Sequence, residues 1–256
     1  MNIFKQFLKS LYSPKDIALF RFQGIGKTIL YIFFLTLLSI IPSSYFLSTA
    51  LIDGVNTARE SIEEDMPDFA IENGQLSSEE NRPVTINKDG FTIIVDPTGA
   101  VSEKDLSNED NAVALLQNEL VLVAGGQDQV HPYSMLGLNL TKNDVTQLLT
   151  NLDSMMGILV PVMIVVIYLF SSAIKFVEIS ILAFFGLMLK NLAGRNLQYR
   201  HLWRMAAYSV TLPTIFFAIM GALQTQVPGG FLIHWFVSLL MLYLAIKEIP
   251  KPTVKE

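Results

Sequence analysis

One pair of ionisable residues interrupts a long apolar stretch of this chain, where charged side chains are costly. Lys175 and Glu178 are the only charged residues between positions 155 and 189. Their spacing of three residues places them on one face of a helix, where an ammonium and a carboxylate can pair. Ionisable residues within an apolar span often mark a path for an ion or a substrate. The alternative is structural, because a lysine near a span end can extend its charge to the interface.

A second set of candidate residues lies in the segment 190–204, which carries basic side chains and no acidic one. These are Lys190, Arg195, Arg200 and Arg204. Tyr199 and Trp203 lie among them, and a basic segment with aromatic residues could bind nucleic acid. The chain as a whole is acidic, with a net charge of −5, and long apolar runs flank the segment. We therefore predict contacts with anionic lipid headgroups and no nucleic-acid partner.

Other residue patterns exclude several kinds of chemistry. The chain has no cysteine, which rules out disulfides, thiolate catalysis and cysteine-based metal sites. The three histidines, His131, His201 and His234, lie in different segments without metal-ligand spacing. No phosphate-binding loop, dinucleotide fingerprint, nucleophile elbow or zinc-protease motif is found in the sequence. The prediction is a non-enzymatic protein with no catalytic residues, no metal and no cofactor.

Acidic and basic residues are concentrated in different parts of the chain, and their distribution predicts which segments lie on which side of a membrane. Residues 53–154 carry 19 Asp and Glu against five Lys and Arg, a net charge of −14. The remainder carries four acidic and 13 basic residues, a net charge of +9. Lys and Arg near the ends of membrane spans are retained on the cytoplasmic side. We expect a multi-pass membrane protein with both termini in the cytoplasm and residues 53–150 outside.

Composition and run length predict the spans. The chain is 51% hydrophobic, its mean hydropathy is +0.44, and a span needs roughly 20 apolar residues. The predicted spans are residues 28–52, about 155–175, 205–224 and 231–246. The predicted fold class is a membrane α-helical, four-span helical bundle with a small extracytoplasmic α+β insert between spans 1 and 2. A five-span alternative makes residues 177–189 a separate span, which would export the basic loop 190–204.

The N-terminal segment, residues 1–27, is predicted to be a cytoplasmic anchor. Residues 1–12 place Phe4, Phe7, Leu8 and Leu11 on one helical face and Lys5, Gln6 and Lys9 on the other. Such a helix is suited to lie on an anionic inner leaflet, with its apolar face in the lipid. Ser13 as N-cap and Pro14 at the first helical position then predict a second helix.

The acidic insert, residues 53–150, mixes strand and helix signals. Residues 84–86 and 91–95 flank Asn87-Lys88-Asp89-Gly90, a strong hairpin signal. Further strands are expected at 69–71, 119–124 and 130–135, and a short helix at 112–117. Thr141 and Asp144 resemble a capping box, from which a helix can run directly into the second span. Residues 151–256 form the predicted C-terminal membrane domain.

Several stretches resemble a known family. They are residues 4–15 (FKQFLKSLYSPK), 21–28 (RFQGIGKT), 93–99 (IIVDPTG), 212–214 (LPT) and 247–252 (KEIPKP). The chain resembles, over essentially its whole length, a family of multi-spanning membrane proteins of unknown function from Gram-positive bacteria. Some members are labelled maltodextrin-utilisation proteins, so the resemblance implies a link to sugar uptake and assigns no residue a role.

Two functions are consistent with these observations. The first is a non-enzymatic accessory or sensor protein whose external domain binds a ligand or an envelope component. In that case the helix that enters the second span would carry the signal to Lys175 and Glu178. The second is an auxiliary subunit of a transport system, for maltodextrin or another oligosaccharide. The predicted partners are the lipid bilayer, with its anionic inner leaflet, and either a membrane protein or a second copy of the chain.

Overall fold

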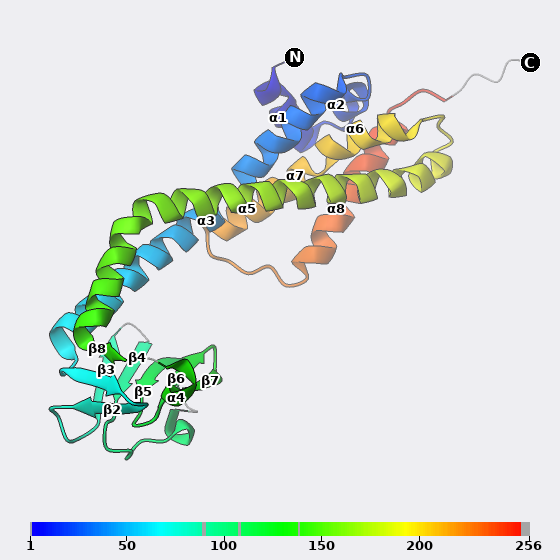
Figure 1. The fold of residues 1–256 in the computed structure, drawn as a ribbon. Helices are drawn as coiled ribbons and strands as arrows, with labels where there is room; N and C mark the ends of the chain where they lie inside the picture. Colours follow the sequence, from blue (N-terminus) through cyan, green and yellow to red (C-terminus); the bar gives the residue numbers. More distant parts are fainter. Residues whose placement is uncertain (1, 89–90, 107–108, 138, 252–256) are drawn as a thin grey trace, which may run out of the picture. The chain divides into compact units, whose positions relative to one another are not determined.

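The computed structural model describes residues 2–88, 91–106, 109–137 and 139–251. The chain forms two compact units (Figure 1). The first, called here the helical unit, comprises residues 1–48 and 160–256, and the second, the mixed unit, comprises residues 49–159. Two long helices, α3 (Ile25–Glu60) and α5 (Lys142–Leu192), contribute to both units.

The helical unit packs short helices against its portions of α3 and α5. These are α1 (Ile3–Tyr12), α2 (Pro14–Phe20), α6 (Tyr199–Ser209), α7 (Thr211–Ala222) and α8 (Gly230–Lys247). Fully buried side chains from different helices form its core, among them Tyr31, Leu182, Leu202, Tyr208 and Leu242. Because this core brings α5, α6, α7 and α8 together, it determines which polar side chains of those helices meet.

Helix α1 forms where it was predicted, but Gln6, which was predicted on its polar face, is buried in the helical unit. Gln6 and Ser10 are buried, whereas Phe4 and Leu8 are 60% and 57% exposed. The Tyr208 hydroxyl donates to Oε1 of Gln6 at 3.2 Å, so the glutamine is satisfied inside the unit. A buried polar group is tolerated when it has such a partner. Gln6 therefore packs on the protein while Lys5 stays exposed, and Phe4 and Leu8 of the apolar face are left uncovered.

Four helices in the described part of the chain are long and apolar enough to cross a bilayer. They are Ile25–Asp65, Lys142–Leu192, Tyr199–Ala222 and Gly230–Lys247. The second contains all 51 residues of α5 without a break, a length of about 76 Å at 1.5 Å per residue. The five-span alternative needs a turn near residue 176, and α5 has none there.

The mixed unit contains two sheets. The three-stranded sheet has the order β2-β1-β8 and the five-stranded sheet the order β3-β4-β5-β6-β7. The strands are β1 (Phe69–Glu72), β2 (Gln75–Ser78), β3 (Val84–Lys88), β4 (Phe91–Val95), β5 (Asn111–Leu115), β6 (Glu119–Ala124), β7 (Gln127–Pro132) and β8 (Leu140–Thr141). Only the β4–β5 pair is parallel within these two sheets; the other pairs are antiparallel.

Most strand predictions in the insert are confirmed, and one helix prediction is wrong. The β3–β4 hairpin pairs Ile86 with Ile93, although residues 89–90 of its predicted turn lie outside the described residues. The predicted helix at 112–117 is instead β5, because residues 111–115 pair with both β4 and β6. Alternate residues Ala112 and Ala114 are buried, which is the period of a strand. The predicted strand at 130–135 ends at Pro132, and α4 (Tyr133–Leu136) follows.

Short helical turns connect these strands and lead into the sheets. A π-helical turn, Ser61–Asp65, follows α3, and a 3-10 helix, Glu103–Leu106, follows the turn that Asp96 organises. The predicted capping box at the start of α5 is present. The backbone N–H and the hydroxyl of Thr141 both donate to Oδ2 of Asp144, and the Asp144 N–H donates to the Thr141 hydroxyl.

Candidate functional site

Four polar side chains from three helices meet inside the helical unit. On α5, Lys175 Nζ donates to Glu178 Oε2 at 2.8 Å, so the predicted ion pair forms. The other carboxylate oxygen, Oε1, lies 2.7 Å from Nε2 of His234 on α8. Lys175 Nζ also donates to the Thr214 hydroxyl of α7 at 3.2 Å. We call these four residues the Glu178 cluster.

The cluster is shielded but not sealed. The side chains of Lys175, Glu178 and His234 are 12%, 14% and 18% exposed. Charges in such surroundings are tolerated only when they are paired and hydrogen-bonded. Each oxygen of Glu178 meets a different nitrogen, and Lys175 has a second acceptor in Thr214. Both oxygens of Glu178 are therefore hydrogen-bonded, and the cluster ties α5 to α7 and α8.

Close helix packing brings the cluster together. Two turns beyond Glu178, Gly186 faces α6 and α8 so closely that a Cβ there would lie 3.2 Å from Leu242 and 3.3 Å from Leu202. Small residues allow helices to approach in this way. The sequence pattern identified Lys175 and Glu178 but missed His234 and Thr214. One signal was present, because His234 is the only acidic, basic or imidazole side chain of α8 before Lys247 at its end.

A cavity of about 620 Å³ adjoins the cluster, and His234 is in its wall. Its other lining residues come from the end of α7, the following loop and the start of α8, and include Gly221, Thr225, Gln226 and Gly230. His234 therefore contacts Glu178 and also lines an open cavity.

The basic residues predicted to contact lipid headgroups have internal partners in three of four cases. Lys190 Nζ donates to the Leu197 carbonyl at 2.7 Å, and Arg195 donates to the Lys247 carbonyl at 3.0 Å. Arg204 donates to the Arg21 carbonyl at 2.9 Å. Arg200 is exposed and has no hydrogen-bond or ion-pair partner within the described ranges. Arg195 and Arg204 thus cap carbonyls near the ends of α8 and α2, and headgroup contact stays a prediction.

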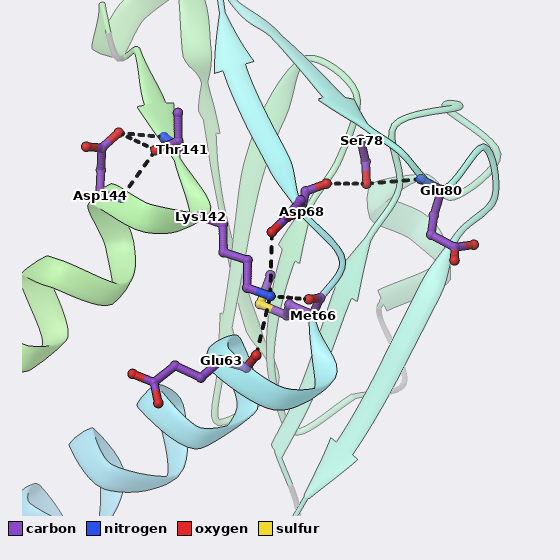
Figure 2. Close-up of polar contacts among 8 residues, drawn as sticks. All are labelled: Glu63, Met66, Asp68, Ser78, Glu80, Thr141, Lys142 and Asp144. Carbon is purple, nitrogen blue, oxygen red and sulfur yellow. Dashed lines mark hydrogen bonds and ion pairs between the residues drawn. The ribbon is translucent and has the colours of Figure 1, made fainter.

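In the mixed unit, Lys142 holds the start of α5 against the end of the α3 segment (Figure 2). Its Nζ donates to the Met66 carbonyl at 2.6 Å and the Glu63 carbonyl at 3.4 Å, and lies 3.8 Å from Asp68 Oδ1. A second tie lies further along α5, where Arg59 pairs with Asp153 at 3.0 Å. The first turns of α5 are therefore fixed within the mixed unit.

Comparison with known proteins gives one match. A family model described as "Protein of unknown function (DUF1189)" matches residues 4–246. No curated protein and no solved structure matches the chain.

Proposed function

This chain belongs to the DUF1189 family of proteins of unknown function, and from that premise we propose that it is a non-enzymatic membrane sensor or accessory protein. In this proposal the mixed unit binds a ligand or an envelope component outside the cell. Helix α5 carries the change to the Glu178 cluster inside the membrane.

Exposed apolar side chains support the membrane location. On α5 alone, eight large apolar residues are more than 40% exposed in residues 162–181: Val162, Val165, Val166, Leu169, Phe170, Ile174, Val177 and Ile181. A soluble monomer rarely exposes a contiguous apolar patch of this kind. Lipid tails are the partner that such a surface fits.

The charge distribution supports the orientation. The mixed unit contains the whole segment of net charge −14, whereas both chain ends and the loop 190–204 are basic. We propose that the termini and this loop are cytoplasmic, where Arg200 and its neighbours meet the anionic inner leaflet.

The observation that carries the proposal is the continuity of α5. This one helix of 51 residues begins at Lys142, is fixed in the mixed unit by Lys142 and Asp153, and includes Lys175 and Glu178. Pro161 lies inside α5 and removes one backbone hydrogen bond, and the remaining hydrogen bonds of the helix transmit rotation or translation across it. A movement of α5 would alter the hydrogen bonds of the Glu178 cluster, because these tie α5 to α7 and α8.

The test softens α5 between the two regions without changing its length. In one variant residues 154–157 are all glycine, and in the matched control they are all alanine, so both lose the same side chains. Each glycine costs about 1 kcal/mol of helix stability relative to alanine. The reporter is a Gly221→Cys thiol in the cavity beside His234, which is the only thiol because the chain has no cysteine.

Full-length protein in nanodiscs is treated with a nanobody raised against residues 66–141, and the rate of thiol labelling is measured. We expect the nanobody to change the labelling rate in the alanine variant and not in the glycine variant. An equal response in both variants, or no response in either, would rule out coupling through α5.

A second candidate is an auxiliary subunit of a transport system for maltodextrin or another oligosaccharide. The observation in its favour is the cavity of about 620 Å³ beside His234, which carries Thr225 and Gln226 as hydrogen-bonding groups. Uptake of labelled maltodextrin is measured in a deletion strain complemented with the wild type or with Glu178→Gln. Uptake that does not depend on the gene removes this candidate.

A further inference from the structure

A separate cavity lies in the mixed unit between the last turns of α3 and the β3–β4 hairpin. Its volume is about 360 Å³, within the roughly 300–1,000 Å³ of typical ligand pockets. The helix contributes Gly54, Thr57, Ala58 and Ser61, which follow the spacing of one helical face. The space exists because these side chains are small where they face the hairpin.

The hairpin supplies an apolar wall. Ile86 pairs with Ile93 and Lys88 pairs with Phe91, and all four residues line the cavity. Ile93 is 8% exposed, whereas Phe91 is 39% exposed. The wall therefore runs from a buried aliphatic end to a partly open aromatic end, which suits a hydrocarbon chain.

The rim of the cavity is acidic. Asp53 lines it, is exposed, and has no ion-pair partner within the part of the chain that the structure describes. Lys88 is already occupied, because its Nζ lies 2.6 Å from Asp65 Oδ2. The hydrogen bond that Lys88 donates to Asp65 raises the pKa of Lys88; burial opposes this, and the charges of Asp65, Glu64 and Glu60 add to it. A further cation at this rim would find a free carboxylate in a field that is negative overall.

We propose that this cavity binds a single-chain amphiphile with a cationic head group. The tail lies against Ile86, Phe91 and Ile93, and the head lies beside Asp53. This inference names the ligand class of the proposed function. It rests on that function for the position of the mixed unit outside the cell. Asp53 is the first charged residue after the uncharged run 28–52, so the cavity opens beside the outer surface of the bilayer.

The same chemistry has two sources: a cationic membrane lipid and a soluble amphiphilic cation. The probe is an alkyl-trimethylammonium with a photoactivatable diazirine in its tail. An alkyl sulfate with the same tail and the same diazirine is the control for charge. Full-length protein in nanodiscs of zwitterionic lipid is irradiated with each probe, and the labelled peptides are identified by mass spectrometry.

Two pairs of variants locate the site. A Cβ at Gly54 would meet no atom within 4 Å, so Gly54→Leu fills the cavity without a clash and Gly54→Ala is its matched control. Both substitutions favour the helix relative to glycine, so loss of binding would not come from loss of folding. Asp53→Asn removes the rim charge and keeps the side-chain shape.

We expect the ammonium probe to label the peptide containing residues 86–93 on the order of tenfold more than the sulfate probe. Labelling should persist in Gly54→Ala and be lost in Gly54→Leu, and Asp53→Asn should remove the preference for the cation. Equal labelling by both probes overturns the ligand class. Labelling that is unchanged in Gly54→Leu overturns the site.

Competition then separates the two sources. The single-chain (lyso) form of an aminoacylated cationic phospholipid is added to the nanodisc in one arm, and unlabelled decyl-trimethylammonium is added to the buffer in the other. Competition in either arm supports the proposal and names the source, whereas competition in neither overturns it. Binding is read independently of the thiol reporter at position 221, so failure of this site and failure of α5 coupling are separate results.

Discussion

At the scale of single residues, the Glu178 cluster depends on the ion pair between Lys175 and Glu178. Lys175 and Glu178 are each less than 15% exposed, and they form an ion pair of 2.8 Å. Removing one partner of such a pair is more damaging than removing both, because it leaves an uncompensated charge.

We therefore predict that Glu178→Leu destabilises the protein by about 3–5 kcal/mol and that Lys175→Leu together with Glu178→Leu costs less. Thermal unfolding in detergent, followed by size-exclusion chromatography, measures both variants. Normal localisation and activity in the double variant would exclude a functional role for the pair. A double variant that is less stable than either single variant would contradict the pairing argument.

Tyr133 presents the opposite case, a buried polar group without a partner. Its side chain is 1% exposed, and its hydroxyl has no hydrogen-bond partner among the described residues. Burial raises the pKa of the phenol, with a smaller contribution from the charge of Glu119, so it stays protonated at neutral pH.

Replacing Tyr133 by Phe should leave the mixed unit equally stable or make it more stable by about 1–2 kcal/mol, because the unsatisfied hydroxyl is removed. Hydrogen exchange of the amides in β1 and β7, measured by mass spectrometry, reports the change. Faster exchange in Tyr133→Phe would contradict the prediction and indicate a bound water on the hydroxyl.

Asp96 makes the stability of the mixed unit depend on pH. Burial alone would raise the pKa of its carboxyl. Hydrogen bonds from the Thr98 hydroxyl and from backbone N–H groups, including that of Val101, outweigh burial and lower the pKa below its usual value. The Thr98 N–H and hydroxyl donate to Oδ1 at 2.9 and 2.6 Å, and the Val101 N–H donates to Oδ2 at 2.6 Å. Because the folded pKa is depressed, this stabilisation is fully present above the unfolded pKa of about 3.9 and is lost as the pH falls through the folded value.

Asp96→Asn should cost about 1–3 kcal/mol at pH 7 and weaken the loss of stability between neutral and acidic pH. Hydrogen exchange of residues 98–101 in the wild type and the variant, compared at each pH, measures the difference. If the difference between the two proteins were the same at every pH, the carboxylate would not be its source.

At the scale of elements, α5 depends on one glycine for its packing. Gly186 has Leu242 and Leu202 within 3.3 Å of the position of a Cβ, whereas at Gly157 on the same helix a Cβ would meet nothing within 4 Å. The two glycines are therefore a matched pair on one helix.

Gly186→Leu should destabilise the helical unit by about 1–3 kcal/mol, the usual range for overpacking, whereas Gly157→Leu should be neutral or mildly stabilising. Thermal unfolding of both variants in the same detergent measures the contrast. Equal effects at the two positions would show that the close approach of α5 to α6 and α8 does not limit stability.

Local sequence signals predicted the element ends well and the element faces less well. Ser13 accepts from the Asp16 N–H at 3.3 Å and Pro14 is the first helical residue of α2, because capping is decided within one turn. Residues 112–117 were assigned to a helix because Ala and Leu favour helices, but pairing with β4 and β6 outweighed that local preference. Helical spacing groups Gln6 with Lys5 and Lys9 on a polar face. Its burial depends on Tyr208, a tertiary partner 202 residues away, which no local pattern reveals.

At the scale of the whole molecule, the charge distribution leads to a prediction of topology. The absence of cysteine means that a single introduced thiol gives an unambiguous label. Ala100 in the mixed unit and Arg200 in the basic loop are both exposed, so Ala100→Cys and Arg200→Cys leave the cores intact.

An impermeant maleimide applied to intact cells should label Ala100→Cys, whereas Arg200→Cys should react only after permeabilisation, since basic loops are retained inside. Both variants are labelled after lysis as a control for accessibility. Labelling of the two positions from the same side of the membrane would overturn the four-span orientation and the sensor proposal that depends on it.

Much about this protein is determined by composition and local order alone. The apolar runs, the sorting of charge and the turn residues predict which segments form long apolar helices and where an acidic α+β insert interrupts them, because these properties need no knowledge of distant partners. Only the tertiary structure decided that His234 and Thr214 join Lys175 and Glu178, and that small residues of α3 leave a cavity against β3 and β4. Those contacts join residues tens of positions apart, and helix packing rather than any local pattern determines which side chains meet.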